Sequence, residues 1–439
     1  MIDRILNKLG ISLNEMQQEA FQSIAHGNKD VVVLSPTGSG KTLAYLLPLS
    51  HLVDAGDDEP QAIVVTPGRE LALQSSTVLK DMSSGLRAMA CYGGRAAMDE
   101  HRVLKQVRPQ IIFGTPGRLN DHLSKGNFSP YHIKYLVIDE FDKGLEMGFQ
   151  DEMSRLIQSL PGLRRHFLLS ATEAEEIPRF VHMGRVEKID YRMDEEQVPE
   201  RVHIYKVESP VKDKLESLGR LLRSLGETST IVFLNYRDSV ERTNNYLVEQ
   251  GFSTSFFHGG LEQKEREASL YRFSNGSANI LVSTDLASRG LDIPDIDNII
   301  HYHIPESEDG YIHRVGRTAR WEAQGRAFFL LGPEEHIPEY VDAAVEDYEI
   351  PAVEELSAPA KPKMATLYIG KGKRDKISKG DILGFLCKKG GLNSSEIGKI
   401  DVNDRYAYAA IARPKLKSVL NNVKGEKIKG VKTIVEEVR

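Results

Sequence analysis

A chain of 439 residues is too long for one hydrophobic core, and at about 100–200 residues per domain it predicts two to four units. The apolar fraction of 40% and the charged fraction of 27% fit an ordinary soluble protein, and no run of about 20 apolar residues is present to cross a membrane. The N-terminus lacks the charged and then apolar pattern of an export signal, and Cys91 and Cys387 lack metal-ligand spacing. We therefore expect a cytoplasmic protein with two free thiols.

Charge is unevenly distributed along the chain. Residues 361–439 hold 19 Lys and Arg against 8 Asp and Glu, a net charge of +11, whereas the preceding 360 residues hold 38 basic and 55 acidic side chains. An acidic body with a basic tail indicates that the tail binds a polyanion, although a solvated, lysine-rich face would have the same composition.

Short apolar runs alternate with helical stretches, which is typical of a parallel sheet covered on both faces. The first series of expected strands comprises 31–34, 62–66, 111–115, 135–139 and 166–170. A second series follows the charged segment 191–201 and comprises 229–235, 279–284, 298–303 and 326–331. We therefore expect two α/β units in tandem.

A second boundary lies at 350–363, which is rich in Pro and Ala and has the composition of a linker. Beyond it we expect strands at 365–369 and 406–411 and two amphipathic helices, hence a small α+β module. Tyr406 and Tyr408 alternate on one strand and Tyr368 lies on the other. Tyrosines on a sheet among lysines predict base stacking, as in RNA-recognition folds, although a half-buried strand alternates in the same way.

The first functional signal follows the first expected strand. It is the run Thr37-Gly38-Ser39-Gly40-Lys41-Thr42, after which a helix begins. Its glycines allow backbone N–H groups to surround a phosphate chain at a helix N-terminus, Lys41 would reach the β- and γ-phosphates, and the Thr42 hydroxyl would bind Mg²⁺. The pattern departs from a full P-loop at Ser35, where Gly is usual. A nucleotide site is nevertheless predicted, because the run lies between an expected strand and an expected helix; the alternative is a glycine-rich turn.

An acidic pair ends the strand 135–139. Asp139 would hold Mg²⁺ through water, and Glu140 would polarise the water that attacks the γ-phosphate. Alone, the pair could be a helix N-cap, but about 100 residues after a P-loop it predicts the metal side of a nucleotide site.

The second unit carries no P-loop but has three arginines spaced three residues apart, Arg314, Arg317 and Arg320. The guanidinium group keeps its charge and binds phosphate through two hydrogen bonds, so these residues could stabilise charge on a nucleotide held by the first unit. ATP would then close the two units as a clamp. The alternative is a basic surface helix.

With these motifs in place, the sequence resembles the DEAD-box RNA helicases over roughly residues 1–345. The shared blocks occur in the family's order: Gln17 in LNEMQQEAF, SPTGSGKT (35–42), TPGREL (66–71), YGG (92–94), TPGR (115–118), DEFD (139–142), SAT (170–172), IVFLN (231–235), HGGLEQKER (258–266), STDLASRGLDIP (283–294) and HRVGRTAR (313–320). The resemblance implies two RecA-like domains and an RNA-dependent ATPase that bends one RNA strand locally.

The resemblance also implies roles at matching positions. Gln17 would read the adenine edge, Asp292 would contact the ribose, and Arg317 and Arg320 would be the arginine fingers. Coupling of hydrolysis to closure would fall to Asp142, Ser170, Thr172, His313 and Arg314. The RNA backbone would be contacted by Arg69, Gly93, Gly94, Thr115, Arg118, Gly259, Gly260, Arg266 and Thr284. Glycines permit close approach to phosphate and arginines neutralise it, although any single glycine could be a simple turn.

Three departures from the family matter. Phe141 replaces the Ala that names it, so an aromatic ring must be packed while the flanking acids remain. Gly68 replaces the usual Thr and removes a hydroxyl that would bind RNA phosphate. The aromatic that stacks on adenine in relatives would fall before the first residue of this sequence, which predicts weaker adenine selectivity.

The tail resembles the DbpA-type RNA-binding domain, notably in KGDILG (379–384) and IGKI (397–400). That resemblance implies a grip on a hairpin of large-subunit ribosomal RNA. Candidate contacts are Tyr368, Lys371, Lys373, Arg374, Lys376, Lys379 and Arg405.

The expected fold is therefore α/β, with two tandem RecA-like parallel-sheet domains, 1–200 and 201–350, a linker 351–363 and a small α+β RRM-like domain, 364–439. The expected function is ATP- and Mg²⁺-dependent RNA unwinding, by a monomer, on structured rRNA in large-subunit assembly or on pre-ribosomal particles. Alternatives are an ATP-gated RNA clamp or annealer, a general mRNA or cold-response RNA remodeller, and a DNA-directed motor of the same superfamily.

Overall fold

The computed structural model describes residues 2–36, 38–94, 97–172, 177–192, 202–285, 296–318 and 324–438. They divide into two compact units, one holding the described residues up to 192 and the other those from 202 onward. No helix among the described residues has the length and apolar character to span a bilayer.

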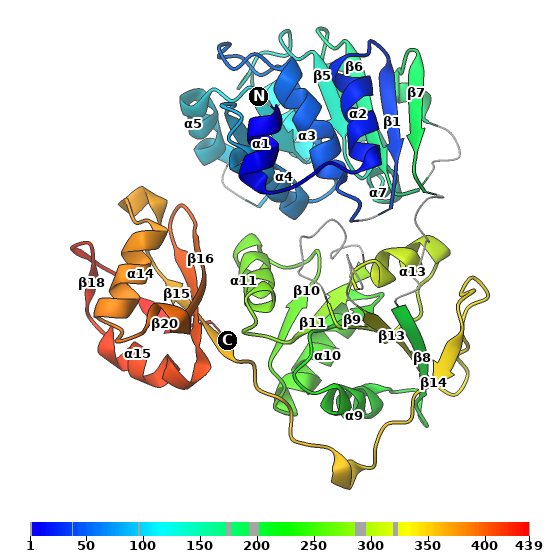
Figure 1. Cartoon of the computed structure of the whole chain (residues 1–439), viewed down its shortest axis with the longest axis vertical. Coiled ribbons are helices and arrows are strands. Elements are labelled where there is room, and N and C mark those ends of the chain that lie inside the picture. Colours follow the sequence, from blue (N-terminus) through cyan, green and yellow to red (C-terminus); the bar gives the residue numbers. More distant parts are fainter. Residues whose placement is uncertain are drawn as a thin grey trace. The chain divides into compact units, whose positions relative to one another are not determined.

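The first unit contains a seven-stranded parallel sheet in the order β3-β4-β2-β5-β6-β1-β7 (Figure 1). Its strands are β1 (Asp30–Leu34), β2 (Ala62–Val65), β3 (Ala88–Cys91), β4 (Ile111–Gly114), β5 (Tyr135–Ile138), β6 (Arg165–Ser170) and β7 (Val186–Asp190). All pairings are parallel, so the carboxyl ends of the strands meet at one edge, where the P-loop follows β1. The five strands predicted here are confirmed, and β3 and β7 at the two edges were not foreseen.

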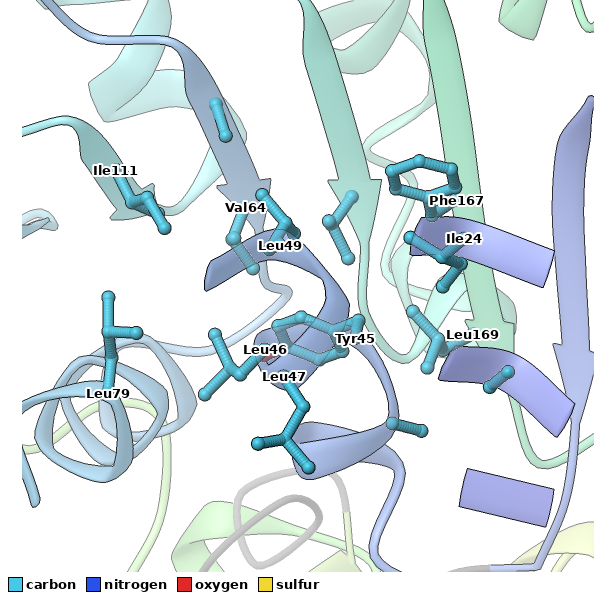
Figure 2. Packing of buried hydrophobic residues seen from close by; sticks show 14 of the residues in the cluster. Ile24, Tyr45, Leu46, Leu47, Leu49, Val64, Leu79, Ile111, Phe167 and Leu169 are labelled. Atoms are coloured by element: carbon cyan, nitrogen blue, oxygen red, sulfur yellow. The ribbon is translucent and has the colours of Figure 1, made fainter. Parts of the chain in front are cut away.

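Helices cover both faces of this sheet. One face packs against α1 (Ile2–Leu9), α2 (Glu15–Ala25), α3 (Lys41–Leu52) and α4 (Arg69–Met82). The other packs against α5 (Ala97–Val107), α6 (Pro116–Ser124), α7 (Phe141–Glu146) and α8 (Gln150–Gln158). Figure 2 shows the first core, in which Tyr45 and Leu49 of α3 lie among side chains of the sheet such as Val64 and Leu169. Because both faces are covered, the central strands hold continuous apolar runs, such as residues 31–34 of β1 and all of β2, rather than alternating.

The second unit begins with another seven-stranded parallel sheet, in the order β10-β11-β9-β12-β13-β8-β14. Its strands are β8 (Val202–Glu208), β9 (Thr230–Leu234), β10 (Thr254–Phe257), β11 (Ile280–Thr284), β12 (Asn298–His301), β13 (Gly325–Leu331) and β14 (Val345–Asp347). The helices are α9 (Leu215–Leu225), α10 (Arg237–Glu249), α11 (Gln263–Ser274) and α13 (Glu308–Val315). Both predicted parallel-sheet domains are thus confirmed.

A small antiparallel sheet of order β16-β17-β15-β20 completes the second unit. Its elements are β15 (Met364–Ile369), α14 (Lys379–Lys388), β16 (Ile397–Val402), β17 (Ala407–Ala412), α15 (Leu416–Asn422) and β20 (Val435–Glu437), with the short hairpin β18 (Lys427–Ile428) and β19 (Val431–Lys432). One face of the sheet and the two helices form the core of this module around Leu367, Ile382, Phe385, Ala409 and Val419. The predicted α+β module is present.

The segment 351–363 has a linker composition but is held in place. Arg223 of α9 donates to the carbonyl oxygens of Leu356 (2.6 Å) and Ser357 (2.7 Å), and Leu356 is buried. Lys361 donates to the carbonyl oxygen of Gly251 at 2.6 Å. The segment is therefore held both by the Arg223 side chain of α9 and by its own Lys361 side chain.

Candidate ATP site and RNA-contact residues

Gln17 connects helix α2 to the phosphate loop. Its backbone N–H donates to Asn14 Oδ1, its Oε1 accepts from the Asn14 N–H, and its Nε2 donates to the Gly40 carbonyl oxygen at 3.1 Å. Gly40 has φ +87°, and a Cβ there would come within 2.3 Å of Gln17 Nε2. The predicted adenine-reading residue and the P-loop are thus one hydrogen-bonded unit; the backbone angle of Gly40 favours glycine, and a larger residue there would also displace the Gln17 amide.

The P-loop lysine rests on the loop itself. Lys41 Nζ donates to the carbonyl oxygens of Ser35 (2.5 Å) and Pro36 (2.7 Å). Its ammonium group lies at the head of α3, where a phosphate anion is favoured by the helix dipole. Gly38, with φ +92°, and Ser39, whose hydroxyl donates to the Pro36 carbonyl, shape the rest of the loop. Thr37 lies outside the described residues.

Asp139 is buried where β5 ends. The Tyr45 hydroxyl donates to its Oδ2 at 3.2 Å, and the Glu140 N–H donates to its Oδ1 at 3.0 Å. Burial, reinforced by the neighbouring Glu140 charge and opposed by Lys41, raises the pKa of Asp139 to about 7. The site therefore holds an excess of buried negative charge that a cation would offset.

Glu140 follows in the left-handed conformation, with φ +49°. This is an uncommon angle for a residue with a side chain, and such strain often marks functional positions. Glu140 Oε2 is buried and accepts no hydrogen bond from the described residues, and Lys143 Nζ lies 3.9 Å away. A buried carboxylate oxygen with unused acceptor capacity can take a proton from a water molecule.

A short network joins the acidic motif to the strand beside the P-loop. Asp142 Oδ2 accepts from the Thr172 N–H at 3.1 Å and from the Thr172 hydroxyl at 3.0 Å. Ser170 accepts at its carbonyl oxygen from the Ser35 N–H at 3.1 Å, and its hydroxyl is buried without a partner among the described residues. The structure thus brings together Asp142, Ser170 and Thr172, which were predicted to couple hydrolysis to closure.

Phe141 packs into the core, as the sequence required of a ring at this position. Only 3% of the residue is exposed, and it lies in the cluster with Val32, Leu34, Leu168 and Met153. The backbone turn that presents Asp139 and Glu140 is therefore anchored from behind by an aromatic side chain.

Arg69 and Gly93, two residues predicted to contact RNA, lie close together in the first unit. The Arg69 guanidinium at the start of α4 lies beside Gly93, where an added Cβ would be 3.6 Å from it. Thr115 is the N-cap residue of α6, but its hydroxyl makes no capping hydrogen bond to the helix. Gly94 is exposed. Arg118 is more enclosed: its Nε donates to the Tyr92 carbonyl oxygen and lies 3.3 Å from Glu100 Oε2.

Glu100 also belongs to a buried trio with Cys91 and His122, whose polar atoms lie within 4.8 Å of one another. His122 Nε2 lies 2.9 Å from Glu100 Oε2, and the same oxygen faces the guanidinium of Arg118. The cation beside Glu100 is therefore a side chain, and burial raises the pKa of the Cys91 thiol well above its ordinary value. Glu100 thus pairs internally with Arg118 and His122.

In the second unit, an arginine that the sequence analysis did not name lies beside Gly259 and Gly260, which were predicted to contact RNA. Arg237, exposed at the first turn of α10, lies so near Gly259 and Gly260 that added Cβ atoms would come within 3.4 Å and 3.6 Å of it. The signal for Arg237 was available in IVFLNYRD, two residues beyond the asparagine that ends the strand run. Of the predicted contacts nearby, Arg266 is buried with its guanidinium 4.8 Å from the Phe257 ring, and Thr284 ends β11.

Two of the three predicted arginines are enclosed in this structure, Arg314 in α13 and Arg317 two residues beyond the end of that helix. Arg314 donates to the His303 carbonyl oxygen and to Asn235 Oδ1, both at 2.8 Å, and its Nε lies 3.7 Å from Asp285. Arg314 therefore ties the ends of β9, β11 and β12 together. His313 and Arg317 are also buried. Arg320 and Asp292 lie outside the described residues.

The module carries the predicted cations on exposed loops and helix ends. Exposed side chains include Lys373, Arg374, Lys376, Lys379 and Arg405. Lys371 pairs with Asp375 at 3.1 Å and Lys379 lies 3.8 Å from Asp401. Tyr368 is half-buried, with the Lys264 ammonium 4.5 Å from its ring centre.

The sequence matches known protein families in each of its three parts. Three family models match: the DEAD/DEAH box helicase over residues 14–180, the helicase conserved C-terminal domain over 213–322 and the DbpA RNA binding domain over 366–437. Among solved structures, Saccharomyces cerevisiae Dbp5 bound to RNA and ADP BeF3 superimposes with a TM-score of 0.69 at 24% identity, covering 79% of this chain and 93% of that one. A structure of Mss116p bound to ssRNA and AMP-PNP gives 0.69 at 24% identity over 80% of this chain and 78% of that one. These two likenesses show the fold.

Whole-length relatives carry the assignment further. The ATP-dependent RNA helicase DbpA of Escherichia coli is 36% identical over 438 residues, covering 97% of this chain and 94% of that protein. The DbpA of Bacillus subtilis is 31% identical over 458 residues, covering 97% and 95%. Together with the P-loop, acidic motif and basic module, these matches show that the chain belongs to the DbpA-type DEAD-box ATP-dependent RNA helicases.

Proposed function

We propose that the protein uses ATP hydrolysis to open short duplexes in a structured ribosomal RNA, which its C-terminal module holds as a hairpin, during assembly of the large subunit. The observation that carries this proposal is the match of the DbpA RNA-binding domain over residues 366–437 on the same chain as a P-loop and a buried Asp139, which accepts a hydrogen bond from Tyr45 of the helix that follows the loop. Its architecture would be two RecA-like domains, 1–200 and 201–350, a linker 351–363 and an RRM-like domain, 364–439, acting as a monomer on pre-ribosomal particles.

Magnesium fits the residues present. Thr42 and Asp139 offer oxygen atoms, which are the ligands Mg²⁺ prefers, and Asp139 is a buried carboxylate at the end of β5. When bound, the ion would neutralise charge on the phosphates. Around it, Lys41 would move from its loop carbonyls to the β- and γ-phosphates, and Glu140 would accept a proton from the attacking water.

The nucleotide would also be held by groups from helix α2, the P-loop and the second domain. Gln17 would read adenine, P-loop residues 37–40 would surround the phosphates, and Asp292 would contact the ribose. Arg317 and Arg320 would stabilise charge on the γ-phosphate once ATP closes the two domains. Asp142, Ser170, Thr172, His313 and Arg314 would relay hydrolysis to that closure.

RNA would be bound along its backbone by the two core domains and gripped by the module. The proposed core contacts are Arg69, Gly93, Gly94, Thr115, Arg118, Gly259, Gly260, Arg266 and Thr284, and Arg237 joins them on the evidence of its position. The proposed module contacts are Lys371, Lys373, Arg374, Lys376, Lys379 and Arg405, which would neutralise phosphates of a hairpin.

An RNA-stimulated ATPase assay tests the catalytic assignment. Glu140→Gln keeps the shape of the side chain and removes its basicity, so turnover should fall by a factor of about 100 or more while ATP still binds. Glu146→Gln changes an exposed carboxylate at the end of the same helix and should leave turnover unchanged. Undiminished turnover in Glu140→Gln would show that another residue is the base.

Crosslinking to cellular RNA tests the target. The full chain should recover one ribosomal RNA region, and a chain ending at Ala360 should lose that preference. Equal, scattered recovery by both chains would favour a general mRNA or cold-response remodeller. Strand-displacement assays separate an unwinding enzyme from an ATP-gated clamp or annealer, since the latter would bind and close on RNA without releasing a strand.

A further inference from the structure

Arg118, one of the proposed RNA contacts, is paired with a buried carboxylate of the first unit. Glu100 of α5 is 4% exposed, and its Oε2 lies 3.3 Å from Arg118 Nε. The Tyr92 N–H donates to the other oxygen, Oε1, at 3.4 Å. A carboxylate buried to this degree is stable only beside a cation and hydrogen-bond donors. Glu100 therefore depends on Arg118 for compensation of its charge, and in turn determines where that guanidinium lies.

His122 adds a directional hydrogen bond to Glu100. Asn127 Nδ2 lies 3.0 Å from His122 Nδ1, and because an amide nitrogen only donates, Nδ1 accepts. The neutral ring then carries its proton on Nε2, which lies 2.9 Å from Glu100 Oε2 and donates to it. His122 is fully buried, so Asn127 selects the tautomer of a ring that water does not reach. Glu100 Oε2 therefore has one hydrogen-bond donor in His122 and one cation in Arg118.

This network joins two segments that were predicted to contact RNA. Tyr92, which precedes the predicted glycine pair, donates its N–H to Glu100 and accepts from Arg118 Nε at 3.2 Å through its carbonyl oxygen. Thr115, the N-cap residue of α6, donates its N–H to the Cys91 carbonyl oxygen at 3.3 Å. The turn after β3 and the first turn of α6 are thus connected through backbone and side chains, and Glu100 contacts both.

We propose that Glu100, supported by His122 and Asn127, is a positioning residue for RNA binding. It holds the Arg118 guanidinium at a fixed place relative to the turn after β3, so that the two segments bind the RNA backbone together. A guanidinium that is ordered before RNA arrives loses less side-chain entropy on binding, and this strengthens the contact. The inference rests on the proposed role of Arg118 as an RNA contact.

ATPase turnover measured against RNA concentration tests the positioning role. Glu100→Gln keeps the size of the side chain and removes its charge, so the RNA concentration for half-maximal turnover should rise about threefold or more, while kcat at saturating RNA stays within about twofold. Asp81→Asn makes the same change in an exposed carboxylate near the C-terminal end of α4 and should alter neither value. An unchanged half-maximal concentration in Glu100→Gln overturns the proposal.

A double-mutant cycle separates positioning of Arg118 from general destabilisation. Arg118→Ala alone should raise the half-maximal RNA concentration, and in that background Glu100→Gln should add less than about a further twofold. Equal effects of Glu100→Gln in both backgrounds would show that Glu100 acts on the fold and not through Arg118, which overturns the proposal alone. If Arg118→Ala leaves the half-maximal concentration unchanged, the Arg118 contact itself is wrong, and the positioning role falls with it.

The order of the hydrogen bonds is tested without RNA. Nitrogen NMR of the histidine-labelled full chain should show His122 as a neutral ring with its proton on Nε2, and His122→Gln identifies the signal by removing it. Asn127→Ala changes a half-buried residue outside the proposed RNA contacts, so it keeps the proposal testable if Glu100→Gln does not fold. It should raise the half-maximal RNA concentration about two- to threefold. A proton on His122 Nδ1 in the parent, or no rise in Asn127→Ala, contradicts the proposal.

Discussion

Asp142 accepts two hydrogen bonds from Thr172 through a single carboxylate oxygen, one from the backbone N–H and one from the hydroxyl. Asp142 stands two residues after the base candidate Glu140, at the start of α7, whereas Thr172 follows the strand that lies beside β1 and the P-loop. A movement of Glu140 that follows a change at the γ-phosphate would therefore be transmitted through Asp142 to Thr172, at the end of β6. Hydrogen bonds to a charged acceptor are among the stronger ones in proteins.

Thr172→Val should separate ATP hydrolysis from RNA unwinding. Valine keeps the branched shape and the backbone N–H but removes the hydroxyl donor, which costs about 1.5–3 kcal/mol of coupling to the Asp142 carboxylate. We expect ATP affinity and RNA-stimulated turnover to change less than about threefold, while strand displacement falls about tenfold or more. The two rates are measured on the same RNA duplex. Thr172→Ser, which retains the hydroxyl, should stay near the parent, and equal loss of both rates in Thr172→Val would contradict a coupling role.

Gly68→Thr should strengthen RNA binding. Gly68 is the N-cap of α4 with φ −120°, an ordinary angle for any residue, and an added Cβ meets no atom within 4 Å. The new hydroxyl would lie beside Arg69 and should add one hydrogen bond to phosphate, about 0.5–1.5 kcal/mol or a two- to tenfold lower Kd for single-stranded RNA. The Kd is measured with a non-hydrolysable ATP analogue present. Gly68→Ala carries the Cβ without the hydroxyl and should not improve affinity, so an equal gain in both variants would point to helix stability instead.

In the first sheet the sequence predicted the central strands but neither edge; in the second it missed the edge strands β10 and β14 and also β8, which lies between β13 and β14. The predicted strands contain continuous apolar runs, which are easily recognised in the sequence between polar segments. At the edges, β3 reads AMAC and β7 reads VEKID, because an edge strand needs only one covered side and often carries charge. The P-loop and the Asp-Glu pair were predictable because phosphate chemistry fixes residue type and spacing. The stacking of the buried Tyr408 ring of β17 on Tyr271 of α11, in place of the base stacking predicted for this strand, was not, since two tyrosines 137 positions apart leave no periodic signal.

Phe141→Ala restores the residue of the family's name yet should destabilise this protein. The ring is buried against Val32, Leu34 and Leu168, and a small cavity of about 90 Å³ already adjoins it. Removing it enlarges that cavity and should cost about 3 kcal/mol of the first unit's unfolding free energy. We expect a lower Tm in calorimetry with ATPase activity retained at low temperature, because Asp139 and Glu140 are unchanged. Phe141→Leu should lose less than half as much, and an unaltered Tm in Phe141→Ala would show that the surrounding side chains close the space.

Acid should weaken the second RecA-like domain through His303. Its Nδ1 accepts the Asn235 N–H at 3.1 Å, next to the Arg314 contacts, which requires a neutral ring. Burial, aided by the Lys214 and Arg314 cations, lowers the pKa of His303 from 6.5 to about 4. Because the unfolded state then binds the extra proton, the stabilisation is complete above pH 6.5 and is lost as the pH falls toward 4.

His303→Asn should therefore flatten the pH dependence of stability. The Asn oxygen can accept the same N–H but does not titrate, so the parent should lose about 1–3 kcal/mol more than the variant between pH 7.5 and pH 5, after allowance for solvent screening. Urea unfolding followed at both pH values measures the difference. His336→Asn changes an exposed histidine in the same domain and should leave the pH dependence as it is. Parallel pH profiles for the parent and His303→Asn would show that acid acts elsewhere, with buried His301, whose pKa is also far below its ordinary value, as the next residue to replace.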